Sequence, residues 1–187
     1  MNPPKLLIDD TVIVGPFTTI GHEGFHFTRD KNNKLTHGEH KFGVILHKDV
    51  WLGSHVTVAR GRWRDTVIGE GTKVDDHAHI SHNVVIGKNC IIATGTSILG
   101  SVTIGDNCEI WTGAILHQGI TIGDNSVVGA GTYLRFDLPP NQVCYRNNKG
   151  VIFKPKSESK KYSQKREGGV SRKTDCLNGS CKSDTSW

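Results

Sequence analysis

The sequence of 187 residues lacks features that define several common protein classes. No apolar run approaches the roughly 20 residues of a membrane-spanning helix, so no membrane span is expected. The N-terminus, MNPPKLLIDD, lacks the apolar centre of a secretory signal peptide, and this favours a cytoplasmic, reducing location. The five cysteines form no CxxC pair and therefore give no sign of a zinc site.

Apolar residues are scarce, at 35%, and acidic residues are fewer than basic ones, which gives a net charge of +5. Most of this excess lies in residues 155–187, which hold eight Lys or Arg and four Asp or Glu. The rest is nearly neutral and shows no basic stripe, so no nucleic-acid partner is expected. Because residues 157–187 are also poor in apolar side chains, they are predicted to form a disordered basic tail.

What the sequence has in abundance is a repeat of six residues. Branched aliphatic residues recur every six positions from Ile68 to Leu134 without insertion or deletion, and a mostly small or β-branched residue follows each by four. The same spacing appears in residues 8–25 and 46–58. This period fits neither an α-helix nor an alternating strand, and it is typical of a parallel β-helix. With three hexads in each coil, the repeat predicts an all-β domain of about six coils at residues 1–140.

Two segments break the repeat, and one follows it. Residues 26–43 are polar, charged and rich in turn residues, so they are expected to leave the solenoid as an excursion loop. Residues 60–65 form a shorter break. Two prolines at 139 and 140 end the last coil, and residues 141–156 are expected to fold back over that end of the helix.

The coil length also converts sequence separation into position. Residues 18 apart stack on one another in successive coils, so Gly100 is expected directly above His82, and His117, 35 residues on, close to the same column. A histidine imidazole ordinarily has a pKa near neutrality, so it can exchange protons under physiological conditions. These positions predict a site on one edge of the prism.

Residues 65–90, DTVIGEGTKVDDHAHISHNVVIGKNC, resemble the bacterial UDP-3-O-acylglucosamine N-acyltransferases of lipid A synthesis. Residues 43–66 and the segment GFHFTRDKNNK are similar to the matching coils and excursion loop of that family. The spacing of His79, His82 and His117 equally resembles the sister O-acyltransferases that act on UDP-N-acetylglucosamine. The resemblance covers residues 8–154. It implies a single-stranded left-handed β-helix and a homotrimer with its sites at the subunit interfaces.

The resemblance also implies roles for individual residues. His82 matches the general base, and the backbone N–H of Gly100 matches the donor that faces the developing oxyanion. The implied substrate-binding residues are Asp75, Asp76, His79, Asn83 and His117. The implied residues for the pantetheine arm and phosphates of the donor are Ala93, Gly95, Gly113, Gly129, Gly131, Arg146, Lys149 and Lys154. No metal is expected.

The chain departs from these families. Its β-helix is expected to begin at residue 8, so the uridine-binding domain of the N-acyltransferases and the C-terminal helices of both families are expected to be missing. An aspartate follows the base in the O-acyltransferases, where this chain has Asn83. These departures favour a smaller enzyme that moves an acyl group, acetyl first, from CoA to an amine of a sugar or nucleotide-sugar in cell-surface polysaccharide or lipopolysaccharide synthesis. A sugar hydroxyl is the second acceptor, and acyl carrier protein is the less favoured donor.

Two other function classes stay open. GAILHQGITIGDNS resembles a turn of the γ-class carbonic anhydrases, which share the fold and need three histidine ligands for zinc. The position of one of those ligands is Thr112 here, so this alternative ranks below acyl transfer. A solenoid used only for assembly is the third class, and its activity would not depend on His82.

Overall fold

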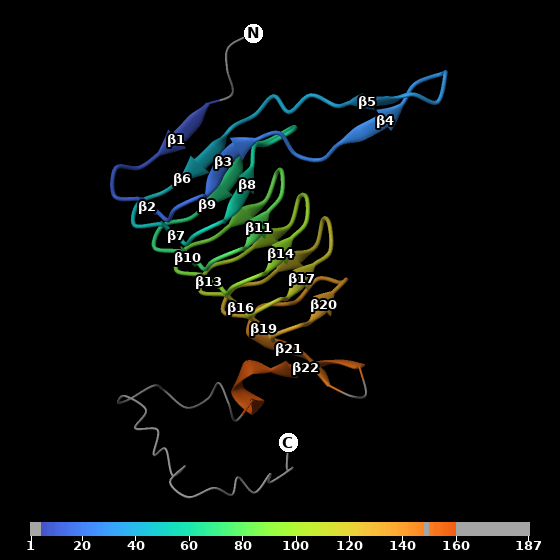
Figure 1. The fold of residues 1–187 in the computed structure, drawn as a ribbon. Helices are drawn as coiled ribbons and strands as arrows, with labels where there is room; N and C mark the ends of the chain where they lie inside the picture. Colours follow the sequence, from blue (N-terminus) through green and yellow to red (C-terminus); the bar gives the residue numbers. More distant parts are fainter. Residues whose placement is uncertain (1–4, 148–149, 160–187) are drawn as a thin grey trace, which may run out of the picture.

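The structure is a computed structural model that describes residues 5–147 and 150–159, and its body is a three-sided parallel β-helix (Figure 1). We call its three sheets A, B and C, and their strands are parallel except for β22. Sheet A contains β1 (Leu6–Ile8), β6 (Val44–Leu46), β9 (Thr66–Ile68), β12 (Val85–Ile86), β15 (Thr103–Ile104) and β18 (Thr121–Ile122). Sheet B contains β2 (Ile13–Val14), β7 (Trp51–Leu52), β10 (Lys73–Val74), β13 (Ile91–Ile92), β16 (Glu109–Ile110), β19 (Val127–Val128), β21 (Gln142–Asn147) and β22 (Gly150–Pro155). Sheet C contains β3 (Thr19–His22), β8 (Thr57–Ala59), β11 (His79–Ile80), β14 (Ser97–Ile98), β17 (Ile115–Leu116) and β20 (Tyr133–Leu134).

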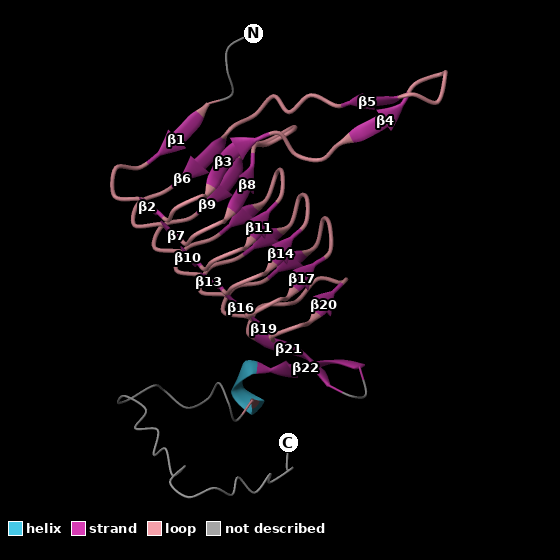
Figure 2. Cartoon of the chain, in the orientation of Figure 1, coloured by secondary structure: helices cyan, strands magenta, loops and turns pink. Residues whose placement is uncertain are grey.

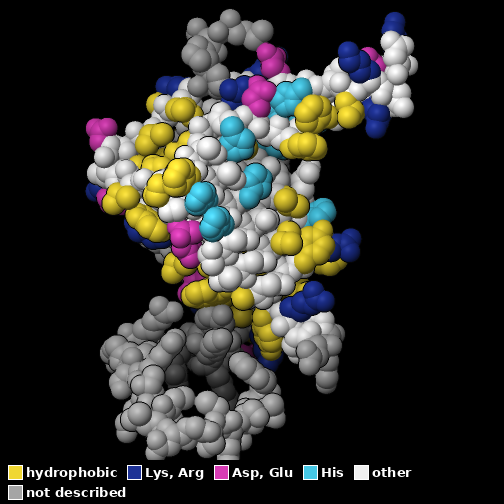
Figure 3. Space-filling view, in the orientation of Figure 1, with side chains coloured by type: hydrophobic (Ala, Val, Ile, Leu, Met, Phe, Trp, Pro, Cys, Tyr) yellow, Lys and Arg dark blue, Asp and Glu magenta, His cyan; other side chains and the backbone are white. Residues whose placement is uncertain are grey.

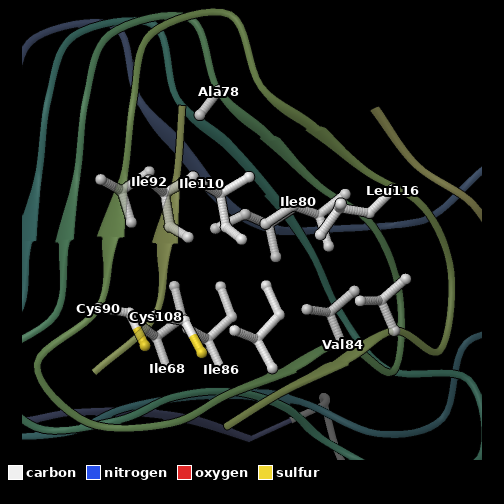
Figure 4. Close-up of a cluster of buried hydrophobic side chains, with 14 of the residues drawn as sticks. Ile68, Ala78, Ile80, Val84, Ile86, Cys90, Ile92, Cys108, Ile110 and Leu116 are labelled. Carbon is white, nitrogen blue, oxygen red and sulfur yellow. The ribbon is translucent and has the colours of Figure 1, made fainter. Parts of the chain in front are cut away.

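The register of the sheets confirms the repeat. From β9 to β17, each strand pairs with the strand 18 residues later, as Ile80 does with Ile98 and Ile92 with Ile110, and the last coil is shorter, with Val128 paired to Cys144. The aliphatic repeat residues point inward, and from Leu46 to Leu134 they are almost completely buried. Figure 4 shows such side chains stacked in rows inside the helix, together with Cys90 and Cys108. Both thiols are free and buried, as their small-residue positions in the repeat predicted. The predicted β-helix of about six coils is confirmed.

The corners between sheets explain the abundance of Gly and Asn. One residue at each of many corners has a left-handed backbone, which Gly and Asn adopt more readily than other residues. These residues also stack 18 apart. They are Gly71, Asn89, Asn107 and Asn125 between sheets A and B; His77, Gly95, Gly113 and Gly131 between B and C; and Asn83, Ser101 and Gly119 between C and A.

The excursion of residues 26–43 is more ordered than the predicted loop. It contains an antiparallel hairpin of β4 (Phe27–Arg29) and β5 (Leu35–His37), which projects from the first coils (Figures 1 and 2). Aromatic, β-branched and leucine residues flank the polar turn DKNNK and favour pairing over an open loop. Both this excursion and the break at 60–65 lie between a strand of sheet C and a strand of sheet A, so both leave the helix at the same corner.

At the other end, β21 adds to sheet B in parallel with β19, and β22 returns antiparallel to β21. A short 3₁₀ helix, Lys156–Glu158, follows. Lys149 and all of the predicted tail from residue 160 onward lie outside the described residues. Within residues 5–147 and 150–159, no helix is long and apolar enough to cross a membrane.

Candidate functional site

His82 and Asn83 form the corner between β11 and β12, where sheet C passes to sheet A. Figure 3 shows histidine side chains gathered on one face of the molecule, beneath the projecting hairpin. The next coil places Gly100 directly against the ring, because a Cβ added to Gly100 would lie 2.7 Å from Cε1 and 3.0 Å from Nε2 of His82. The carbonyl of His82 accepts a hydrogen bond from the Ser101 N–H at 2.9 Å, which fixes this stacking. The predicted juxtaposition of His82 and Gly100 is confirmed.

Two atoms at this corner are available for chemistry. In the described part of the chain, the backbone N–H of Gly100 donates no hydrogen bond. Nε2 of His82 also has no hydrogen-bond partner among the described residues, and this atom is not fully buried. His82 as a whole is 9% exposed, so its open edge faces outward while the rest of the ring is enclosed. A proton-transfer atom and an N–H donor therefore lie side by side.

Asn83 has no side-chain atom to spare for a substrate, which differs from the contact predicted from the sequence. Its side chain is completely buried. Its Oδ1 accepts hydrogen bonds from the backbone N–H groups of Arg62 at 2.7 Å and Trp63 at 3.2 Å. Its Nδ2 donates to Nδ1 of His82 at 2.9 Å and to Oγ of Ser101 at 3.3 Å. Asn83 therefore orients the imidazole.

The surroundings keep His82 neutral. Burial lowers the pKa of its imidazole, and the neighbouring His26 and the positive charge of Arg62 lower this pKa further. A histidine whose pKa falls below its ordinary value is unprotonated at neutral pH. A neutral imidazole has one ring nitrogen without a proton, and which nitrogen that is depends on the hydrogen bonds of the ring.

Sequence reasoning missed the residues that enclose His82, because they come from the two breaks in the repeat. The ring of His40, which is 2% exposed, lies 5.4 Å from the His82 ring, and the Trp63 ring lies 5.9 Å from it, both edge to face. Neither ring nitrogen of His40 has a hydrogen-bond partner among the described residues. A usable signal was present. Each break follows three hexads, and His82 also follows three hexads, so all three fall at the same corner.

Of the other predicted histidines, His79 lies on β11, just before the His82 corner, and His117 lies one position away from the column of His82. Nδ1 of His79 is hydrogen-bonded to Oγ1 of Thr57 at 2.7 Å on the outer face of sheet C. Burial lowers the pKa of His79, with smaller effects from His22 and His82. The residue that stacks two coils above His82 is Gln118, one position past His117. The ring of His117 lies 6.2 Å from the ring of Tyr133.

Asp75 and Asp76 lie at a different corner, between sheets B and C. Oδ1 of Asp76 accepts a hydrogen bond from the backbone N–H of Ser54 at 2.7 Å, and Oδ1 of Asp75 accepts one from the N–H of Asp76. These two carboxylates therefore already stabilise turns, and within one chain they do not join His82.

Most of the predicted donor-binding residues share that second corner. Gly95, Gly113 and Gly131 stack there, and an added Cβ at any of them would meet no atom within 4 Å. Ala93 is buried, and Gly129 packs against Tyr145. Arg146 and Lys154 lie on β21 and β22 and are exposed. A single chain thus carries the open glycine edge and the His82 corner on separate edges of the prism.

No group of three or more His, Cys, Asp or Glu side chains among the described residues is arranged to hold a metal ion. The histidines around His82 face one another as rings in edge-to-face or stacked contacts.

Comparisons with known proteins agree with this architecture. The bacterial transferase hexapeptide family (six repeats) matches residues 65–100 and 101–135. A UDP-3-O-acylglucosamine N-acyltransferase of Nitrobacter winogradskyi is 45% identical over 87 residues, which cover 46% of this chain and 25% of that protein. Its counterpart in Methylorubrum extorquens is 43% identical over 89 residues, which cover 48% and 25% of the two chains. The matched part thus spans about a quarter of the length of these curated relatives.

Solved structures show the likeness of fold. A UDP-N-acetylglucosamine acyltransferase of Bacteroides fragilis has a TM-score of 0.66 and 22% identity, over 82% of this chain and 59% of that one. The Arabidopsis UDP-N-acetylglucosamine acyltransferase has a TM-score of 0.70 and 20% identity, over 82% and 51%. The chain therefore carries the hexapeptide repeat of bacterial transferases on a parallel β-helix, and nearly half of it is similar in sequence to UDP-3-O-acylglucosamine N-acyltransferases.

Proposed function

We propose that this protein is an acyltransferase that moves an acyl group, acetyl first, from a CoA thioester to an amine of a sugar or nucleotide-sugar. We place this reaction in cell-surface polysaccharide or lipopolysaccharide synthesis in the cytoplasm, and the names of the relatives support N-acyl transfer to a UDP-linked sugar. The observation that carries the proposal is the stacking of a neutral, partly open His82 on Gly100, whose N–H is free of any acceptor in the described structure.

In the proposed reaction, the amine nitrogen attacks the thioester carbonyl carbon, and His82 takes the proton that the nitrogen loses. The carbonyl oxygen gains negative charge, which the N–H of Gly100 stabilises. Such a donor typically contributes about 2.7–4 kcal/mol to the transition state. Collapse of the tetrahedral intermediate forms the amide and breaks the carbon–sulfur bond, and the proton on His82 passes to the leaving thiolate. A sugar hydroxyl as acceptor follows the same steps with an ester as product.

The donor site requires a second copy of the chain in this proposal. The open glycine edge of one protomer would face the His82 corner of another, as in a homotrimer with three interface sites. Lys149, Arg146 and Lys154 would then serve the phosphates of CoA, or acyl carrier protein as the less favoured donor. Sedimentation equilibrium tests this part, since a monomeric species at assay concentrations would contradict it.

Release of the CoA thiol, followed with DTNB across a panel of nucleotide-amino sugars, tests the reaction. We expect turnover that depends on both substrates and falls by at least about 100-fold in His82→Ala. Absence of turnover with every acceptor, or unchanged turnover in His82→Ala, contradicts the proposal. In the second case the activity would not use this corner.

A further inference from the structure

The hydrogen bonds of Asn83 determine which nitrogen of His82 carries the proton. An Asn side chain presents one acceptor, Oδ1, and one donor, Nδ2, and the two ends are told apart by their partners. Here one end contacts the backbone nitrogens of Arg62 and Trp63, which only donate. That end must be Oδ1, so the end that contacts His82 must be the donor Nδ2. Nδ1 of His82 is therefore an acceptor.

A neutral imidazole carries one proton, so an acceptor at Nδ1 leaves that proton on Nε2. Nε2 is also the nitrogen that is not fully buried and has no bond to the described chain. The resting ring accordingly presents a donor to the outside. A base that acts at Nε2 needs the opposite tautomer, in which the proton on Nδ1 would point at the N–H of Asn83.

The corner does not let Asn83 turn to accommodate that tautomer. Its backbone is left-handed, with φ 60°, and its own N–H donates to Oγ1 of Thr66 at 3.0 Å. A rotated amide would bring Nδ2 against the N–H of Arg62. Resting on the function proposed above, we propose that Asn83 is a positioning residue that sets the tautomer of His82, holding the proton on Nε2 and so limiting proton acceptance from the acceptor group.

Asn83→Asp reverses this arrangement with nearly the same shape. One carboxylate oxygen still accepts from Arg62 and Trp63, and the other now accepts from His82, which moves the proton to Nδ1 and frees Nε2. The added negative charge also raises the pKa of His82. Among the described residues, the other titratable or charged groups near this corner are His26 and His40 of the excursion, Arg62 and Arg64 of the 60–65 segment and His79 of β11, and the variant substitutes none of them.

The test is the proton position on His82, read by ¹⁵N NMR of histidine-labelled full-length protein, with His82→Gln to assign the signal. We expect the Nε2–H form in the wild type, the Nδ1–H form with a raised pKa in Asn83→Asp, and the wild-type pattern in the control Asn107→Asp, a left-handed corner Asn remote from the site. In thiol-release assays, kcat of Asn83→Asp should rise by about threefold to tenfold with little change in KM, the worth of one hydrogen bond.

If the wild-type protein carries the His82 proton on Nδ1, the inference is wrong, and this measurement does not depend on any variant folding. An unchanged tautomer in Asn83→Asp also overturns the inference. A kcat for Asn83→Asp that stays at or below the wild-type value overturns the rate-limiting part. If no variant turns over any substrate, the proposed function fails, while the NMR result still decides the role of Asn83.

Discussion

Gly100→Ala tests the His82 corner most directly, because it adds one methyl group at a known place. The new Cβ would lie 2.7 Å from Cε1, 3.0 Å from Nε2 and 3.3 Å from Nδ1 of His82. The backbone of Gly100 is not left-handed, so alanine itself is not strained there. The three atoms nearest to the new methyl group all belong to the imidazole, so its contact with His82 should dominate the effect.

An ordinary carbon–carbon contact is about 3.5–4.0 Å, so the ring must move by roughly 1 Å. It cannot move freely, since Asn83 holds Nδ1 and the rings of His40 and Trp63 pack beside it. Overpacking of this kind typically costs about 1–3 kcal/mol of unfolding free energy. A shift of a catalytic group by about 1 Å lowers the rate by about 100-fold, so we expect that loss in kcat.

The assay pairs urea unfolding with thiol release in a double-mutant cycle of Gly100→Ala and His82→Ala. Without the imidazole the added methyl group has room, so Gly100→Ala should cost less than about 0.5 kcal/mol in the His82→Ala background. An equal stability cost in both backgrounds would show that the methyl group meets something other than the ring. Wild-type activity in Gly100→Ala would refute the geometric argument altogether.

Three further outcomes follow from burial and charge. Burial lowers the pKa values of His40, His79 and His82, so below about pH 6.5 the unfolded state binds more protons than the folded state, and the unfolding free energy should decrease as the pH is lowered. Urea titrations at about pH 7 and pH 5 check this, and His79→Gln should make the decrease smaller. Arg62→Met removes a charge that lowers the pKa of His82, so this pKa should rise in NMR titration; an unchanged value would contradict the assigned cause. Ile92→Ala, in the core, should cost about 2–5 kcal/mol in urea unfolding, whereas Ile91→Ala, 41% exposed on the adjacent position, should cost less than about 1 kcal/mol; similar costs would mean that the inward register is wrong.

The sequence by itself determined the β-helix, its coil length and the stacking of Gly100 on His82. The physical reason is that a parallel β-helix repeats one local pattern, so Ile80 and Ile98 have the same environment and a count of 18 residues is also a position. Pairing in such a fold is nearly one-dimensional, and hydrophobic residues at fixed intervals are sufficient to specify it. The same count, applied to the breaks, would have placed both of them at the His82 corner.

Only the tertiary structure decided what encloses His82 and what Asn83 does. The segments at 26–43 and 60–65 have no period, so the contacts of His40 and Trp63 with His82 depend on the path of the chain outside the repeat. The role of Asn83 depends on two backbone N–H groups from one of those segments, 20 and 21 residues earlier in the chain. Hydrogen bonds are directional, so they are fixed by three-dimensional geometry that no spacing along the sequence encodes.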